Sequence, residues 1–104
     1  GGFFPYHLGR FDQGFTVRSG SRAPQASAPP SAYLKNLYFD TLVYRVDTLD
    51  NLRRLVGSGH LMLGTDFPYT LGDWMAVEKV EALDCPEAEK MEILEGNARR
   101  LLKL

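Results

Sequence analysis

Residues 60–65, HLMLGT, form a short and almost wholly apolar run that ends just before Asp66. Such a run is typical of a strand buried on both faces, which is the usual situation of strands in a parallel sheet. A tight turn cannot join parallel neighbours, because the chain must cross back over the sheet, and it usually does so as a helix. The run therefore predicts an α/β fold in which helices separate parallel strands.

The residues before this run supply the other parts of such a unit. Residues 36–46, NLYFDTLVYRV, are rich in β-branched and aromatic side chains, which favours a strand. In residues 48–56 the apolar side chains recur at helical spacing. Asp47 or Thr48 can cap this helix, and Gly57 suits its C-terminal end. We therefore predict the order strand, helix, strand, with the two strands parallel.

Three further helices are predicted in the C-terminal part of the chain. Each has an apolar stripe and a candidate N-terminal cap. Gly96 is predicted to end the second of them, because glycine readily adopts the left-handed conformation found at helix C-termini. The predicted helices and their caps are 74–83 with Asp73, 86–95 with an Asp84–Glu87 capping box and Pro86 in the first turn, and 97–103 with Asn97.

The N-terminal third has no clear periodicity. Residues 1–18, GGFFPYHLGRFDQGFTVR, mix aromatic residues, glycines and arginines, so we expect a loop that leads into a short helix. Residues 19–32, SGSRAPQASAPPSA, contain three prolines, which block regular structure, and are expected to form an exposed loop. Because the chain is apolar from residue 3 onward and opens without a capping signal, we expect that residues 1–104 are one segment of a longer polypeptide.

Composition argues against several classes of function. The 104 residues carry a net charge of −1, so no basic surface for nucleic acid or for an anionic membrane is expected. No apolar run reaches the roughly 18 residues that a membrane-spanning helix needs. The single cysteine, Cys85, cannot form an internal disulfide, which agrees with a reducing compartment, and a cytoplasmic location is predicted.

Asp66 is the first candidate for a functional residue. In parallel α/β folds, functional side chains gather beyond the C-terminal ends of the strands, and Asp66 directly follows the predicted strand 60–65. Taken alone, this carboxylate either binds a ligand or caps a helix and braces the loop. His60 lies at the opposite end of the same strand, and about five residues at ~3.3 Å each separate the two. We therefore expect His60 to be a solvated residue outside the site.

Four segments of the chain occur in the same order near the C-terminus of one group of known enzymes. They are GGFFPYHLGRFDQGF with a later arginine, LYFDTLVY, LMLGTDFPYTLGDW and ILEGNARRLL. In these segments the chain resembles the amidohydrolase superfamily, and most of all the aminocarboxymuconate-semialdehyde decarboxylase group with its relatives that act on γ-resorcylate and similar aromatic acids. Only the loop 19–32 lies outside the likeness.

The resemblance implies that the chain is the C-terminal portion of a metal-dependent (β/α)8 TIM barrel. Such a barrel takes at least ~200 residues, so a chain of 104 residues is too short to close one alone. In the family, a His-x-His pair, a further histidine and an aspartate that closes the eighth strand hold the metal. LGTDFPY matches the last of these motifs. The resemblance therefore assigns Asp66 as a metal ligand, with zinc as the expected divalent metal and manganese as the second choice.

The resemblance also assigns a role to Arg10. Decarboxylases of this group have an arginine at this place that reaches across the dimer to a carboxylate of the substrate. A guanidinium suits this task, because it is permanently charged and can donate two parallel hydrogen bonds. A structural ion pair with Asp12 or with another acidic residue is the alternative. Arg18 is expected to be structural or to lie at the dimer interface.

No catalytic residue is assigned within the chain. The proton-transferring histidine of the family precedes the glycines of the first motif, and it would lie before Gly1. His7 is expected on the side of the active site, but it does not lie at a family motif position. Trp74, Phe67 and Tyr69 either line an aromatic substrate pocket or pack the loop that carries them.

The resemblance thus implies a metal-dependent decarboxylase or hydrolase. Its expected partner is a small carboxylate-bearing substrate, which is aromatic in some relatives. No nucleic-acid or membrane partner is expected. The 104-residue chain alone is expected to be inactive, because it would supply one protein ligand to a metal that needs three or four. We expect it to form a homo-oligomer, a dimer in the family, or to associate with the rest of the barrel. A non-catalytic fragment that only mediates an interaction is the alternative.

Overall fold

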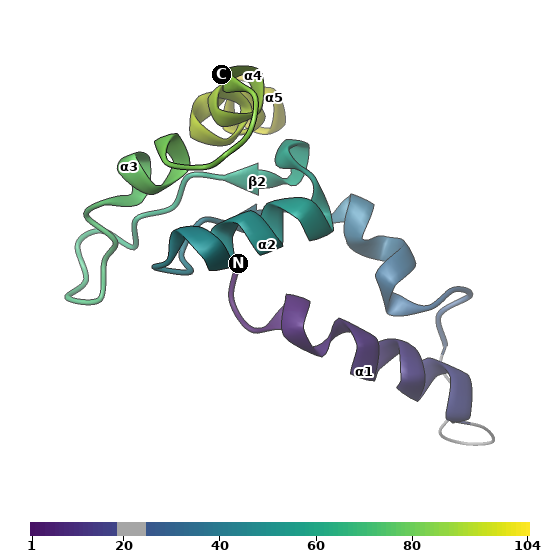
Figure 1. Cartoon of the computed structure of the whole chain (residues 1–104). Coiled ribbons are helices and arrows are strands. Elements are labelled where there is room, and N and C mark those ends of the chain that lie inside the picture. Colours follow the sequence, from purple (N-terminus) through teal and green to yellow (C-terminus); the bar gives the residue numbers. More distant parts are fainter. Residues whose placement is uncertain (19–24) are drawn as a thin grey trace.

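The computed structural model describes residues 1–18 and 25–104. Its centre is a parallel β–α–β unit made of β1 (Phe39–Asp40), α2 (Val46–Val56) and β2 (Leu61–Met62). Phe39 lies opposite Leu61, and Asp40 lies opposite Met62. A long N-terminal helix points away from this unit, and the other α-helices follow β2 (Figure 1). The predicted order and the parallel direction of the strands are confirmed.

Both strands are shorter than the sequence predicted. The ladder of β1 and β2 ends after two residues in each strand, whereas we expected strands over 36–46 and 60–65. Beyond Met62 the chain stays hydrogen-bonded, but to other partners. The N–H of Leu63 donates to the carbonyl oxygen of Ile93 at 3.0 Å, and Gly64 is bonded to the side chain of Thr41. A helix carbonyl and a hydroxyl thus replace the missing rungs of the ladder.

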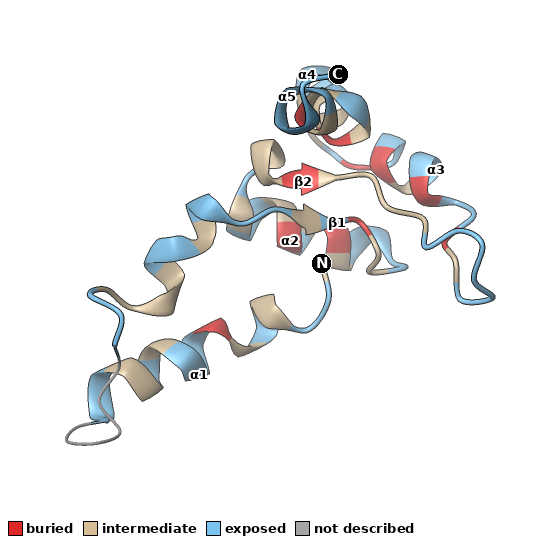
Figure 2. Ribbon diagram, turned by 180° about the vertical axis from the view of Figure 1, so that it is seen from behind, coloured by how far each residue is buried: buried red, intermediate tan, exposed pale blue. Residues whose placement is uncertain are grey.

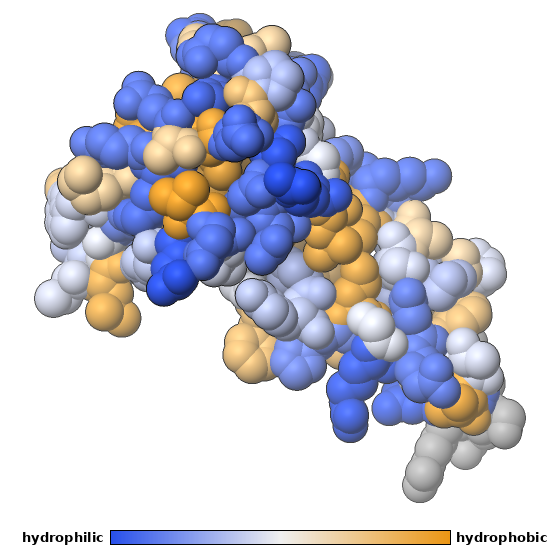
Figure 3. Space-filling view, viewed as in Figure 1, coloured by the Kyte–Doolittle hydropathy of each residue, from blue (hydrophilic) through white to orange (hydrophobic). Residues whose placement is uncertain are grey.

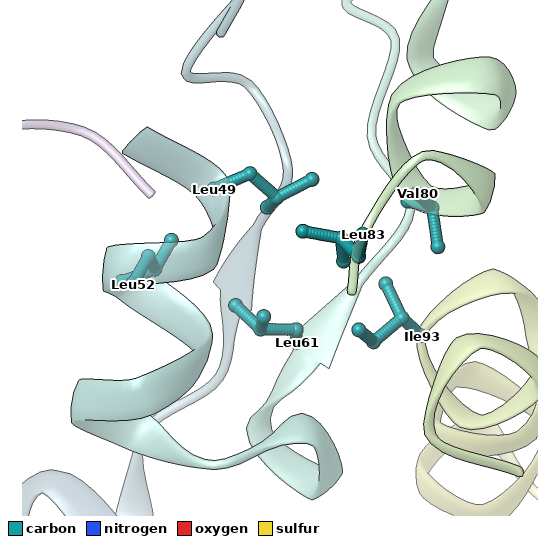
Figure 4. Close-up of a cluster of buried hydrophobic side chains, with 6 residues drawn as sticks. All are labelled: Leu49, Leu52, Leu61, Val80, Leu83 and Ile93. Atoms are coloured by element: carbon teal, nitrogen blue, oxygen red, sulfur yellow. The ribbon is translucent and has the colours of Figure 1, made fainter. Parts of the chain in front are cut away.

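The hydrophobic core surrounds Leu61, which is fully buried. Figure 2 shows the buried part of β2 in red. Figure 4 shows Leu61 between side chains of α2 on one side and side chains of the C-terminal helices on the other. α2 has the predicted bounds to within two residues, and Gly57 ends it with φ +85° as expected. The prediction that Asp47 or Thr48 caps α2 is wrong, because the N-cap is Arg45. The buried core residues are Leu49, Leu52, Leu61, Val80, Leu83 and Ile93.

The C-terminal helices differ from the prediction at their boundaries. α3 covers Ala76–Glu81, and α4 (Glu87–Met91), the π-helix η4 (Glu92–Gly96) and α5 (Asn97–Leu102) follow one another without a break. Gly96 has helical φ and ψ angles of −58° and −43°, so the prediction that it ends a helix is wrong. The predicted Asp84–Glu87 capping box is also wrong, because α4 has Pro86 as its N-cap and no side-chain cap.

Asn97 explains why the helix continues past Gly96. Its side chain is fully buried, and its amide nitrogen donates to the carbonyl oxygens of Ser58 and Leu61 at 2.7 Å each. Its backbone N–H donates to the carbonyl oxygen of Glu92, five residues earlier, which is the bond of a π turn. The predicted role of Asn97 as a helix cap is therefore wrong. This residue ties the C-terminal helix to the start of β2.

The variant Asn97→Leu is expected to destabilise the fold strongly. Leucine fills a similar volume but leaves the buried carbonyl oxygen of Leu61 without a donor, which costs about 1–3 kcal/mol. The loss of stability is measured by urea unfolding, monitored by circular dichroism, of a folded polypeptide that contains residues 1–104. The exposed Asn51→Leu makes the same chemical change on the surface of α2 and serves as the control. Equal midpoints for the two variants would contradict the role of Asn97.

The N-terminal region contains more helix than the sequence predicted. α1 covers Phe4–Val17, where we expected a loop leading into a short helix. It packs against the 3-10 helix η2 (Pro30–Asn36), and the carboxylate of Asp12 accepts the N–H of Ser31 at 2.9 Å. Of the predicted exposed loop 19–32, residues 25–27 are exposed, residues 19–24 lie outside the described residues, and the part from Pro30 onward is helical.

The shape differs from that of a self-sufficient domain. The radius of gyration is 15.7 Å, whereas a compact domain of this length has about 13 Å. Many large apolar side chains are exposed, among them Phe3, Tyr6 and Leu71 at 75–78%. Figure 3 shows apolar patches on the face in view, one of them at the tip of the loop that follows β2. Within the described residues, no helix is both long and apolar enough to cross a membrane.

Candidate functional site

The C-terminal edge of the two strands brings three of the sequence motifs together. β1 ends at Asp40, whose carboxylate accepts the N–H of Leu42 at 2.9 Å and is bonded to the nitrogen of Gly1. A β-carbon on Gly64 would lie 3.0 Å from the β-carbon of Asp40, so glycine lets the chain after β2 approach β1 closely. The segments GGFFPY, LYFDTLVY and LMLGTDFPY therefore meet at this edge.

Glycine is also required at the first position. A β-carbon on Gly1 would lie 2.6 Å from Cδ2 of Leu52 and 2.7 Å from Cγ1 of Val43. Real side chains do not tolerate such distances, so a larger residue would displace the segment from α2. Gly1 is thus held between α2 and Asp40, on the same edge as Asp66, whereas a β-carbon on Gly2 would meet nothing within 4 Å.

Asp66 lies at this edge with an exposed side chain. Its φ angle is +57°, a left-handed conformation that aspartate tolerates better than most residues. Its carbonyl oxygen accepts the N–H of Tyr69 at 2.9 Å. Its carboxylate makes no hydrogen bond or ion pair with another described residue. The alternative that Asp66 caps a helix or braces the loop with its side chain is therefore not observed, and the residue is exposed.

The loop after Asp66 is closed at its base. The N–H of Asp73 donates to the carbonyl oxygen of Thr65 at 2.8 Å, and the hydroxyl of Tyr44 donates to the carbonyl oxygen of Leu71 at 2.9 Å. The buried carboxylate of Asp73 accepts the N–H of Met75 at 3.1 Å and pairs with Lys79 of α3. Asp73 therefore anchors the loop before α3, although the N-cap of this helix is Met75.

The aromatic residues of this loop lie on its surface. Phe67 and Trp74 meet edge to face, with ring centroids 5.8 Å apart. Both rings are about two-thirds exposed, as is Tyr69. The contact between Phe67 and Trp74 supports the interpretation that these residues pack the loop, and none of the three lines the grooves that lie beside α1 and α2.

Arg10 is exposed on α1 and lines a groove together with Phe11, Phe15 and Arg18. No acid among the described residues forms an ion pair with Arg10, and Asp12 bonds to a backbone N–H instead. The structural pairing with Asp12 is therefore not observed. Figures 1 and 2 both show α1 extending away from the loop that carries Asp66. A single chain does not bring Arg10 and Asp66 together.

The histidines and the cysteine do not form a second site with Asp66. His7 stacks on Phe3 of the same helical face, with ring centroids 4.6 Å apart. His60 is half-buried, and its Nδ1 lies 2.9 Å from the carbonyl oxygen of Leu37, so the expectation of a solvated residue is only partly correct. Burial raises the pKa of the Cys85 thiol, which keeps it neutral and makes it a poor nucleophile.

Asp66 suits the role of a single metal ligand. Hard carboxylate oxygens are preferred by divalent cations such as Mn²⁺, and the exposed position leaves the other coordination sites open. In residues 1–18 and 25–104, however, no three histidine, cysteine or acidic side chains come close enough to hold a metal ion. A complete centre therefore needs ligands from outside the described residues.

Thr41 is the residue near this edge that our sequence reasoning missed. It is buried, with 2% of its surface exposed, and its hydroxyl is bonded to both the N–H and the carbonyl group of Gly64. A threonine in a β-rich stretch is unremarkable, and the partner lies 23 residues further along the chain. No local pattern could have revealed this contact.

Comparison with known proteins shows the family to which the chain belongs. A family model described as amidohydrolase matches residues 6–104. This chain belongs to the amidohydrolase family. It is 33% identical to 2-amino-3-carboxymuconate-6-semialdehyde decarboxylase of Dictyostelium discoideum, over the whole of this chain and 29% of that protein. It is 31% identical to 2-keto-4-carboxy-3-hexenedioate hydratase of a Sphingobium species, over 97% of this chain and 30% of that protein.

Solved structures show where this amidohydrolase segment lies in the family fold. The dihydroxybenzoic acid decarboxylase of a Polaromonas species, solved with manganese and the inhibitor 2-nitroresorcinol, superimposes with a TM-score of 0.73 at 26% identity. The match covers 97% of this chain and 31% of that enzyme. Similar structures are TIM barrels, and this chain corresponds to their C-terminal part. The expected portion of a (β/α)8 barrel, too short to close by itself, is thus confirmed.

Proposed function

We propose that this amidohydrolase segment belongs to a metal-dependent decarboxylase that acts on a small carboxylic acid, with Asp66 as a metal ligand and Arg10 as a substrate-binding residue. The accessible carboxylate of Asp66 at the C-terminal edge of the strands is the observation that carries the proposal. In TIM barrels the reacting groups gather at this edge. The compounds from which the three relatives above take their enzyme names are all carboxylic acids, which supports a carboxylate substrate.

The two residues would act in different ways. A bound divalent cation would supply Lewis-acid stabilisation of negative charge on a substrate oxygen. Asp66 would hold the cation from the start of the loop after β2, just beyond a segment that is hydrogen-bonded to Ile93 and Thr41. Arg10 would orient the substrate through two charge-assisted hydrogen bonds to a carboxylate. Because Arg10 lies away from Asp66 in its own chain, we propose that it serves the site of a neighbouring subunit in a cytoplasmic dimer.

Manganese is the first metal to test, because the Polaromonas decarboxylase was solved with it. Zinc, which we expected first from the sequence, stays a prediction. Hydration is the second candidate reaction, because the Sphingobium relative is a hydratase of similar identity. Release of carbon dioxide separates the two reactions, since hydration keeps all the carbon atoms of the substrate. Hydrolysis and a purely non-catalytic role also stay predictions, without support from these relatives.

A complete barrel can be built by replacing the matching 29% of the Dictyostelium decarboxylase with residues 1–104. We expect this complete barrel to release carbon dioxide from muconate-type or hydroxybenzoic acids in the presence of Mn²⁺. The isolated 104-residue chain should show no turnover, because it offers one candidate ligand and much exposed apolar surface. The unaltered Dictyostelium enzyme is the control. Turnover by the isolated chain that disappears in Asp66→Ala would contradict the need for the rest of the barrel.

A further inference from the structure

We propose that Thr41 is the positioning residue for Asp66, through its hydrogen bonds to the Gly64 peptide group. The inference rests on the proposed function, because it takes Asp66 to be a metal ligand. It adds a residue that touches neither metal nor substrate and yet sets the direction in which the Asp66 carboxylate points.

The hydroxyl of Thr41 takes the place of a neighbouring strand. Thr41 directly follows β1, at the point where the ladder with β2 ends. Its Oγ1 accepts the N–H of Gly64 at 3.1 Å and donates to the carbonyl oxygen of the same residue at 3.3 Å. Both polar groups of Gly64 are therefore satisfied by one buried side chain. Valine at position 41 would keep the shape and leave both groups without this partner.

The opposite side of the same strand is held by the π turn. Because the N–H of Asn97 donates to the carbonyl oxygen of Glu92, the carbonyl oxygen of Ile93 is released from the regular helical pattern. This oxygen accepts the N–H of Leu63 at 3.0 Å. The segment after β2 is thus fixed at Leu63 by the helix and at Gly64 by Thr41, immediately before Thr65 and the exposed Asp66.

Only Thr65 separates this fixed point from Asp66. The carbonyl oxygen of Thr65 accepts the N–H of Asp73 at 2.8 Å, which closes the loop behind it. Asp66 has φ +57°, a conformation that aspartate tolerates but that is still less common than the right-handed one, so its surroundings help to hold it. Loss of the bonds to Gly64 would let Asp66 relax toward a common conformation and would turn its carboxylate away from the edge of the strands.

The test measures the affinity of the complete barrel for Mn²⁺, with free Mn²⁺ followed by electron paramagnetic resonance. Groups that orient a metal ligand contribute a factor of about 10–100 in affinity. We therefore expect the Kd for Mn²⁺ to rise by about 10–100-fold in Thr41→Val and to stay within about threefold in Thr41→Ser, which keeps the hydroxyl. Thr41→Ala removes the hydroxyl without added bulk and replaces Thr41→Val if the latter folds poorly.

Leu83→Ala is the matched control, because it opens a cavity in the buried core cluster and removes none of the hydrogen bonds to Leu63 or Gly64. It should lower the unfolding midpoint and leave the Kd for Mn²⁺ within about threefold of the unsubstituted barrel. An unchanged Kd in both Thr41→Val and Thr41→Ala, or an equal rise of the Kd in Leu83→Ala, would overturn the positioning role. Tight binding of Mn²⁺ by Asp66→Ala would instead overturn the proposed function, and this inference with it.

Discussion

Replacing Asp66 with alanine in the complete barrel is expected to remove bound Mn²⁺ and to lower decarboxylation by at least about 100-fold. Removal of a group that only orients a metal ligand lowers metal affinity or activity by about 10–100-fold. Removal of the ligand itself should lower them by about 100-fold or more. The carboxylate is exposed and bonded to no other described residue, so its removal breaks no observed contact. Elemental analysis of the purified protein and a carbon dioxide assay measure both effects.

Two variants separate the loss of a ligand from a change in the backbone. Asn tolerates the left-handed conformation of residue 66 about as well as aspartate does, so Asp66→Asn keeps the fold of the loop and removes the charge. It should lose most of the Mn²⁺ as well. Asp84→Ala removes an exposed aspartate from the turn after α3 and should change neither quantity. Full metal content in both Asp66 variants would show that the ligand lies elsewhere.

Arg10→Ala is expected to leave the metal content intact and to weaken the binding of a carboxylate-bearing substrate. Loss of a desolvated charge-assisted pair costs about 2–5 kcal/mol, which should appear mainly as a higher KM. The exposed Arg99→Ala, which removes an arginine paired with Glu95 on α5, is the matched control. Steady-state kinetics measure the KM of both variants, and elemental analysis measures their metal content. An unchanged KM in Arg10→Ala would remove this residue from the site.

Mixed dimers test whether Arg10 acts across the subunit interface. Protomers with Arg10→Ala are combined with protomers that carry Asp66→Ala, and each parent variant alone has low activity. If Arg10 serves the neighbouring subunit, each hybrid dimer holds one site with both residues intact, so part of the activity returns. If Arg10 serves its own subunit, every site in the hybrid lacks one residue and no activity returns. Native mass spectrometry confirms that hybrids have formed.

Elements whose signals are local could be predicted from the sequence. The apolar spacing of α2 and its terminal Gly57 follow from rules that act over one or two helical turns. The apolar run before Asp66 indicated a parallel strand, and the pairing of Phe39 with Leu61 confirms it. Asp66 itself was a candidate because it follows this strand and because LGTDFPY matches a family motif.

Predictions failed where distant contacts outweigh local preference. Gly96 should end a helix by its own propensity, but the buried bonds of Asn97 to Ser58 and Leu61 hold the helix in a continuous π turn. α1 lacks a clean apolar period, and its packing against η2 and the bond between Asp12 and Ser31 support it instead. Burial of a few polar groups thus decided these boundaries, since each such group needs a partner and the partner lies far along the chain.

The sequence by itself determined the parallel β–α–β order, the membership of the amidohydrolase family and the place of Asp66 at the end of a strand. Only the tertiary structure decided that the Asp66 carboxylate is accessible, that Thr41 and Ile93 hold the strand before it, and that Arg10 lies away from it. The physical reason is the separation along the chain of the residues that interact. Apolar periodicity and capping act between near neighbours, whereas the hydrogen bond from Leu63 to Ile93 joins groups that only the folded chain brings together.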